Sequence, residues 1–240
     1  MATMENFNED WGSALCVAAH PDDLEYGLAA GVARWTAQGK SVTYLLATSG
    51  EAGIDAIPPV EAGPLREQEE RDGAARVGVE VVDFLGMPDG GLEYGPALRR
   101  AIASQIRLRQ PDVVFSLTHR ERFAGGGTNQ ADHRHLGLAT LDASADAGNR
   151  WIYPELEGQG LQPWSGVTQV CFAGSAEPTH TVDVSDTFDD AVASLEAHEQ
   201  YLQGLGSSYP TPRELLQNIL GSRVHDDLGD YTLALEVFQR

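Results

Sequence analysis

A histidine and two aspartates stand close together near the start of the chain, in the stretch His20-Pro21-Asp22-Asp23. His20 and Asp23 are three positions apart, so across the first turn of a helix both side chains can point to one spot. An imidazole nitrogen and a carboxylate oxygen are ligands that zinc accepts. Asp22 lies between them and would point elsewhere, which leaves its carboxylate free to act as a base. The spacing predicts part of a metal centre.

The same stretch also has the composition of a helix start. Proline suits the first helical position, and aspartates in the first turn cap the free N–H groups and favour the helix dipole. This alternative accounts for Pro21 and one aspartate, but it does not account for His20. Two ligands alone do not make a metal site, so the metal hypothesis needs a third.

The best candidate for the third ligand is His133, in the pair Asp132-His133. This pair follows a glycine-rich loop over 119–130, which leaves the carboxyl edge of the predicted sheet. Two histidines and one carboxylate leave the fourth zinc position open for water, as in catalytic sites. The remaining histidines are expected to be structural or solvated: His135 and His225 in solvent, His180 and His198 in satisfied structural positions, and His119 as the one that could line the pocket.

Apolar runs alternate with helical patterns along the chain, which is typical of βαβ units and a parallel sheet. The first run ends just before His20, and ligands bind at the carboxyl ends of such strands. The pattern predicts strands over 13–19, 41–48, 79–86, 111–118, 166–174, 179–184 and 231–238, and helices over 23–38, 65–78, 96–110, 132–147, 188–205 and 212–220. The stretch 148–165 is expected to be irregular, and its Trp151, Tyr153 and Trp164 could stack on a sugar or belong to the core.

The 240 residues suit a single α/β domain over 1–240. A net charge of −20, from 16 basic and 36 acidic residues, argues against binding of nucleic acid or anionic membranes. The same imbalance, with Lys40 as the only lysine, fits either a salt-rich cell or a GC-rich genome.

We expect a cytoplasmic protein without a secretory signal or membrane span. Cys16 and Cys171 are expected to be buried free thiols.

Several motifs together resemble the LmbE/PIG-L family of zinc-dependent N-deacetylases. They are AHPDD after the first predicted strand, TSGEAG after the second, the stretch REQEERDGAARVGVEVVDFLGMPDGGL, and DHR at the start of a later helix. The resemblance covers about residues 13–145, with a weaker continuation to 198; the strands and helices over 165–240 would complete the domain. It implies a Rossmann-like three-layer fold and one zinc ion, and a substrate that is an N-acetylated small molecule, most often an N-acetylglucosaminyl compound.

The resemblance also implies roles for individual residues. His20, Asp23 and His133 would bind Zn²⁺, and Asp22 would be the general base. Arg66 and Asp89 would hold the substrate; the alternatives are a surface charge paired within a helix for Arg66 and a turn residue for Asp89.

The chain departs from the family pattern at the second motif. The family commonly has His-Pro-Asp-His there, and this chain reads Gln130-Ala131-Asp132-His133. Gln130 can donate a hydrogen bond to an oxyanion but cannot deliver a proton. The alternatives to an N-deacetylase are therefore a catalytically silent zinc- or sugar-binding protein of the same fold, and an amidase that acts on thiol–sugar conjugates. A nucleotide-binding domain is disfavoured because no GxGxxG follows the first strand. The sequence leaves association into a homo-oligomer open.

Overall fold

Eight strands form one sheet in the computed structural model, which describes residues 4–221 and 229–240. The order across the sheet is β1-β7-β8-β6-β5-β2-β3-β4. Strands β2 to β6 run parallel to one another, β1 runs parallel to β7, and β8 runs antiparallel between β6 and β7. Their bounds are β1 Glu5–Asn6, β2 Ser13–Ala18, β3 Ser41–Leu46, β4 Val81–Phe84, β5 Val113–Leu117, β6 Gln169–Ala173, β7 His180–Asp183 and β8 Thr232–Gln239. The predicted mostly parallel α/β sheet is confirmed.

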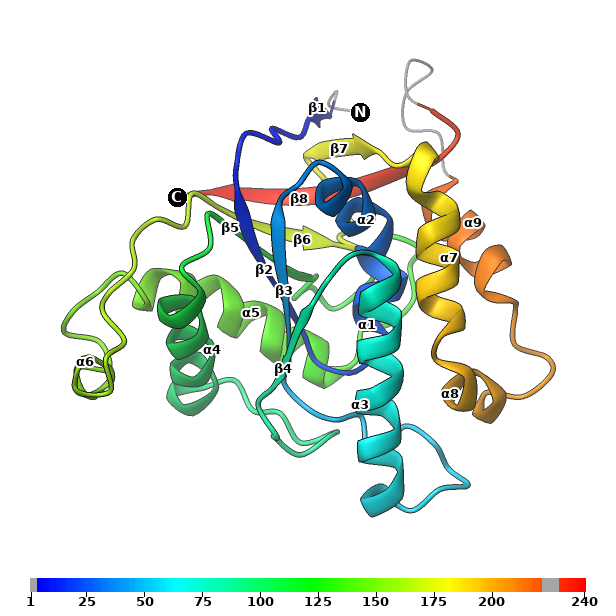
Figure 1. Ribbon diagram of the computed structural model, residues 1–240, viewed down its shortest axis with the longest axis horizontal. Coiled ribbons are helices and arrows are strands. Elements are labelled where there is room, and N and C mark those ends of the chain that lie inside the picture. The colour runs from blue at the N-terminus through cyan, green and yellow to red at the C-terminus, as the bar shows by residue number, and fades with distance from the viewer. Residues whose placement is uncertain (1–3, 222–228) are drawn as a thin grey trace.

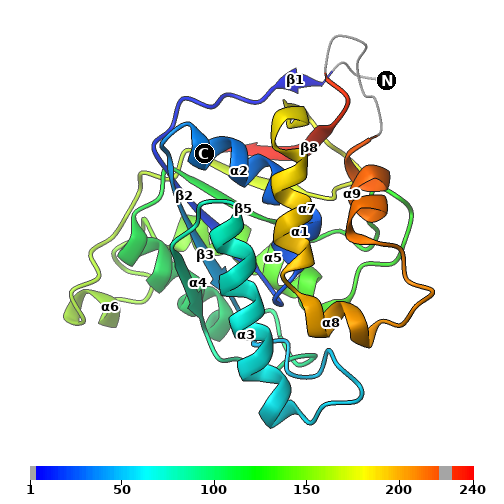
Figure 2. The same ribbon diagram turned by 45° about the vertical axis from the view of Figure 1, so that its right-hand side comes forward.

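Helices cover both faces of this sheet and give the fold three layers (Figures 1 and 2). One face carries α4 (Pro96–Arg109) and α5 (Ala131–Asp146). The other carries α1 (Asp23–Gly27), α2 (Ala29–Ala37), α3 (Pro59–Arg76), α7 (Phe188–Glu196) and α9 (Pro212–Leu220). Two short helices, α6 (Glu155–Gly158) and α8 (Glu199–Gly204), lie in the connections. The predicted three-layer α/β architecture is therefore present.

The side chains of strand β2 are buried on both faces of the sheet. Successive side chains of a strand point to opposite faces, and here Cys16 and Ala18 enter the core beneath α1 and α2, while Leu15 and Val17 enter the core beneath α4 and α5. A continuous apolar run is what a central parallel strand needs. Both Cys16 and Cys171 are buried free thiols, as expected.

Two helices predicted as continuous are each broken in the structure. The predicted helix 23–38 is interrupted at Leu28, which has φ −133° and ψ −19°. The preceding Gly27 lies so close to β5 that an added Cβ would stand 2.5 Å from a methyl carbon of Leu117. The predicted helix 188–205 is interrupted before His198, whose side chain turns into the interior with no exposed surface. In both cases a tertiary contact overrides a favourable local pattern.

Helix α3 begins earlier than predicted. The sequence analysis predicted its start at residue 65, directly after Pro64, and a proline inside a helix removes one backbone hydrogen bond. The helix instead starts at Pro59, a residue suited to the first helical position, and continues through Pro64. Strand β1 and helix α6 were not predicted; both are short. His225 lies outside the described residues. Within the described residues, no helix has both the length and the apolar character that a membrane span requires.

The sheet order changes direction around β2, which has β3 on one side and β5 on the other. Loops that leave adjacent strands in opposite directions open a crevice at their carboxyl ends, where ligands of such folds bind. The segments after β2, β3, β4 and β5 all reach this edge. They carry every residue that the sequence analysis assigned to the site.

Candidate metal centre

The three predicted zinc ligands come together at the carboxyl edge of the sheet. His20 Nδ1 lies 3.2 Å from His133 Nε2. Asp23 contributes one oxygen 3.0 Å from His133 Nε2 and the other 3.4 Å from His20 Nδ1. All three side chains are buried or nearly so. Two ligand atoms at about 2.05 Å from a tetrahedral zinc ion would be about 3.3 Å apart, so the spacings of His133 Nε2 from His20 and from Asp23 are close to those of a zinc site.

His20 is held by carboxylates on the side away from the other two ligands. Its Nε2 lies 3.0 Å from Asp89 Oδ1 and 3.4 Å from Asp132 Oδ2. Because carboxylates only accept, the Nε2 proton belongs to this contact, and Nδ1 is the nitrogen that faces Asp23 and His133. Burial alone would lower the pKa of His20, but hydrogen bonds to the three carboxylates raise it to about 12. Such surroundings favour a positive charge at this position, which a metal ion would supply.

Asp89 therefore faces His20, a predicted metal ligand, where the sequence analysis expected it to hold the substrate. Its Oδ2 accepts a hydrogen bond from the backbone N–H of Ala52 at 2.8 Å, so both oxygens have partners. Asp132 is fixed in the same way by the backbone N–H groups of Gly90 and Leu92, at 2.8 and 3.2 Å. Carboxylates that accept from the second nitrogen of a metal-bound histidine orient the ring and make it a stronger ligand. Sequence reasoning missed this role for both residues.

His133 is oriented by Asn129, a residue that the sequence analysis did not single out. The amide nitrogen of Asn129 donates to the carbonyl oxygens of Thr118 at 2.7 Å and Arg120 at 3.0 Å, which fixes the orientation of the amide. Its Oδ1 then lies 2.9 Å from His133 Nδ1 and must accept from it. The Nε2 atom of His133 is then left as an acceptor that faces His20 and Asp23 and lies 3.0 Å from the amide nitrogen of Gln130, which donates to it. The only available signal was a spacing of four residues from a candidate ligand.

Replacing Asn129 by alanine should lower the zinc affinity of the protein about 10- to 100-fold, the usual effect of removing a hydrogen-bond partner of a metal ligand. Asn129→Asp is the informative companion because it keeps an acceptor for Nδ1 but loses both donations to Thr118 and Arg120. Titration with a competing chelator would measure both affinities. We expect Asn129→Asp to bind zinc more tightly than Asn129→Ala; equal weakening in the two variants would mean that Asn129 acts only by anchoring the loop.

The family assignment follows from comparison with known proteins. Residues 15–144, which carry β2 to β5 and all the ligands, match the family described as PIG-L: GlcNAc-PI de-N-acetylase. The chain belongs to the PIG-L family. It is 30% identical over 197 residues to a diacetylchitobiose deacetylase of Thermococcus kodakarensis, a match that covers 81% of this chain and 72% of the relative.

Other members are more distant or longer. A 1D-myo-inositol 2-acetamido-2-deoxy-alpha-D-glucopyranoside deacetylase of Geodermatophilus obscurus is 32% identical over 60% of this chain, which spans 56% of its length. The structure of an N,N'-diacetylchitobiose deacetylase from Pyrococcus horikoshii superposes with a TM-score of 0.84 over 96% of this chain and 85% of that chain, at 21% identity. At that identity, the superposition establishes a shared fold.

Asp22, which the PIG-L resemblance implies to be the general base, is buried beside the ligands. It precedes α1 in a left-handed conformation with φ 89°, which is strained for a residue with a side chain. Its Oδ2 lies 3.2 Å from Arg66 Nη2, and Tyr201 also hydrogen-bonds to the carboxyl group. Burial raises the pKa of Asp22 to about 6, against the opposing pull of Arg66.

Arg66, the other residue expected to hold the substrate, is engaged within the protein. Its Nη1 donates to the carbonyl oxygen of Gly50 at 2.8 Å, and Nη2 donates to that of Pro21. The guanidinium lies over the ring of Tyr201, 4.2 Å from its centre, and the residue is 2% exposed. Arg66 thus ties the loop after β2 to the loop after β3. The geometry favours a positioning role over direct contact with a substrate.

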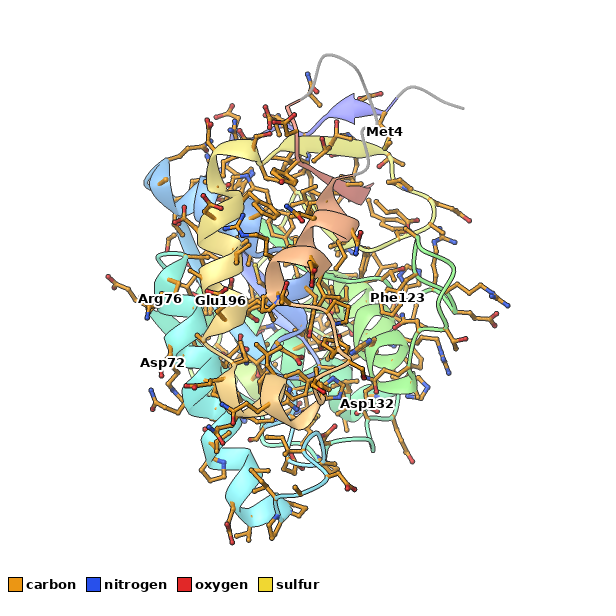
Figure 3. The ribbon with its side chains drawn as sticks, turned by 90° about the vertical axis from the view of Figure 1, so that its right-hand side faces the viewer. Met4, Asp72, Arg76, Phe123, Asp132 and Glu196 are labelled. Atoms are coloured by element: carbon orange, nitrogen blue, oxygen red, sulfur yellow. The ribbon has the colours of Figure 1, made fainter. Side chains whose placement is uncertain are left out.

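Gln130 faces the ligands, as the alignment of the second motif implied. It caps the start of α5, but its side chain makes no capping bond; its amide nitrogen lies 3.0 Å from His133 Nε2. The ring of Phe123, labelled with Asp132 in Figure 3, lies on another side of His133 with ring centres 6.0 Å apart. His119 instead packs against Phe172 and Phe238.

The aromatic segment over 148–165 contributes nothing to this centre. Trp164 donates to the carbonyl oxygen of Pro111, which precedes β5 and therefore lies at the opposite edge of the sheet. Trp151 is 82% exposed. His135 is half-buried against the carbonyl oxygen of Leu92, so it is less solvated than expected.

Proposed function

We propose that this protein hydrolyses the acetamide group of an N-acetylated amino sugar and uses Zn²⁺ held by His20, Asp23 and His133. The observation that carries the proposal is the close approach of these three side chains. His133 Nε2 lies 3.2 Å from His20 Nδ1 and 3.0 Å from one oxygen of Asp23, and the other oxygen of Asp23 lies 3.4 Å from His20 Nδ1. Separate hydrogen-bond partners orient the two histidines. The curated relatives that match the chain, as described above, are named as deacetylases of acetamido sugars, which supplies the substrate class.

Zinc, when bound, would lower the pKa of a water molecule toward about 7 and polarise the acetyl carbonyl group. The carboxylate of Asp22 would accept the proton of the attacking water and return it to the leaving amine. Arg66 would keep Asp22 in place through their ion pair. The amide N–H of Gln130 would donate a hydrogen bond to the carbonyl oxygen as negative charge develops there.

The direct test is release of free amine from a panel of N-acetylated sugars, including N-acetylglucosamine and diacetylchitobiose, with and without a chelator. We expect turnover of at least one member, loss of turnover after chelation, and recovery when zinc is added back. Thiol–sugar amides belong in the same panel because they would identify the amidase alternative. A zinc-loaded protein that binds these sugars and turns over none of them would instead support the silent-protein alternative, which the glutamine at position 130 motivates.

Gln130→Ala measures how much the neutral hydrogen bond contributes. Removing one donor from an oxyanion site typically costs about 2.7 to 4 kcal/mol, which is about 10²- to 10³-fold in kcat. Because zinc would carry most of the developing charge, we expect a loss of about 10²-fold or less. Gln130→His, which restores the common family residue, should be at least as active as the unmodified protein. If steady-state kinetics show no change in either variant, Gln130 does not face the reacting carbonyl group.

A further inference from the structure

A second group of metal-binding residue types lies inside the protein, outside the centre described above. Glu25 of α1, Glu70 of α3 and His198, which precedes α8, are 1%, 0% and 0% exposed. Potential ligand atoms of the three side chains all lie within 4.8 Å of one another. Three elements far apart in the sequence therefore bring two carboxylates and an imidazole to one point of the core.

The polar atoms of this cluster are only partly satisfied. Ser194 Oγ donates to Glu25 Oε1 at 3.1 Å, and the backbone N–H of Asp22 donates to Glu70 Oε2 at 3.0 Å. Within the described part of the chain, both ring nitrogens of His198 have no hydrogen-bond partner, and Glu25 Oε2 and Glu70 Oε1 have none unless one of the two carboxyl groups carries a proton and donates it to the other. His198 was predicted to be a satisfied structural histidine; it is buried, but it is not satisfied.

The fold keeps room for these groups. An added Cβ on Gly73 would stand 3.2 Å from both Glu25 Oε1 and His198 Nε2, and 2.9 Å from the carbonyl oxygen of Ser194. A larger residue on this face of α3 would have to displace the cluster. Glycine thus permits the close approach of α3 to the junction of α7 and α8.

Two carboxylates share one imidazole in this cluster, so at least one carboxylate charge is left without a counterion even though His198 lies within ion-pair distance of both. Unpaired carboxylates cost several kcal/mol each to bury, and the nearby guanidinium of Arg66 is already paired with Asp22 and two carbonyl oxygens. His198 Nε2 is 3.6 Å from Glu25 Oε2 and 3.8 Å from Glu70 Oε2, too far for hydrogen bonds. Ligand atoms arranged tetrahedrally around an ion at about 2.1 Å would be about 3.4 Å apart, slightly closer together than these atoms are.

We propose that Glu25, Glu70 and His198 bind a second divalent cation of the zinc type. This ion would be enclosed in the core, separate from the first centre, formed by His20, Asp23 and His133, which we call the open centre. The ion would neutralise the two carboxylates and join α1, α3 and the start of α8. Through Glu70 it would also fix the backbone of Asp22, whose strained conformation sets the direction of its carboxylate. Shared protons are the competing way to neutralise the cluster, since burial raises the pKa of Glu25 to about 7 and that of Glu70 well above its usual range.

The test is the zinc content of protein produced in zinc-supplemented medium and gel-filtered into metal-free buffer, measured by mass spectrometry. We expect two zinc ions per chain in the unmodified protein, and one in either Glu70→Gln or His133→Ala. Brief treatment with a chelator should remove one ion from the unmodified protein, because the open centre exchanges faster than the enclosed one. This experiment does not depend on deacetylase activity, so the two proposals fail separately.

Exposed acidic residues on α3 and on the neighbouring helix α7 provide matched controls. Asp72→Asn on α3 and Glu196→Gln on α7, both labelled in Figure 3, should keep two zinc ions. The same zinc content in Glu70→Gln as in the unmodified protein would overturn the proposal in favour of shared protons. A single zinc ion in the unmodified protein would overturn it if His133→Ala removes that ion; if Glu70→Gln removes it instead, the first centre is the one that fails. If Glu70→Gln does not fold, anomalous diffraction at the zinc edge from crystals of the unmodified protein decides directly.

Discussion

Replacing His133 by alanine is expected to remove zinc from the open centre and to lower kcat/KM by at least about 10³-fold, since a catalytic metal supplies several kcal/mol of transition-state stabilisation. The physical reason is geometric. His133 Nε2 lies 3.2 Å from His20 Nδ1 and 3.0 Å from Asp23 Oδ1, so the His133→Ala variant keeps only two of the three predicted ligands. Zinc content and amine release, measured on the same preparation, would check both parts.

His135→Ala is the matched control, because His135 lies one half-turn further along α5 and bonds to a backbone carbonyl group. It should keep both the zinc content and the activity of the unmodified protein. An unchanged zinc content in His133→Ala would show that the ligand set is wrong. Zinc loss with unchanged turnover would show that the hydrolysis does not need this metal.

Replacing Asp22 by asparagine should keep the zinc and the fold but lower kcat about 10²- to 10⁴-fold, the usual contribution of a general base. The substitution preserves size and removes the ability to accept a proton. Asp22 is 4% exposed and paired with Arg66, so part of any loss could come from a shifted loop. Zinc content and the melting temperature of each variant must therefore accompany the kinetics.

Asp72→Asn, on the exposed side of α3, serves as the control for removal of an acidic charge and should behave as the unmodified protein does. An intact, zinc-loaded Asp22→Asn with an unchanged kcat would place the base elsewhere. A variant that loses zinc together with activity would instead assign Asp22 to holding the metal centre in place.

The predicted metal ligands at the carboxyl edge of the sheet could be recognised from the sequence because the signals for them are local. The apolar run before His20, the short spacing to Asp23 and the glycine-rich loop before His133 each act within a few residues. In a parallel sheet the carboxyl ends of neighbouring strands meet at one edge, so these local signals were enough to predict that His20, Asp23 and His133 converge. The motif resemblance then supplied the zinc and the reaction class.

The roles of Asp89 and Arg66 depend on contacts that no local pattern contains. Asp89 meets His20 across 69 positions of sequence, and Arg66 meets the carbonyl oxygen of Pro21 across 45. The loop that lies beside such a polar side chain decides whether it faces a substrate or a residue that binds the metal. The family resemblance assigned Asp89 and Arg66 to the substrate, and the chemistry of their side chains allows both roles.

The sequence by itself determined the order of elements, the buried character of β2 and the residue types at the open centre, because hydrophobic periodicity and short spacings are properties of neighbouring residues. Only the tertiary structure decided where the predicted helices 23–38 and 188–205 break. The turn before His198 brings an imidazole to Glu25, 173 positions away, and Gly73 leaves the space for it. Packing of α1, α3 and α7 at close distance outweighs the helical preference of each segment, and that packing creates the buried cluster.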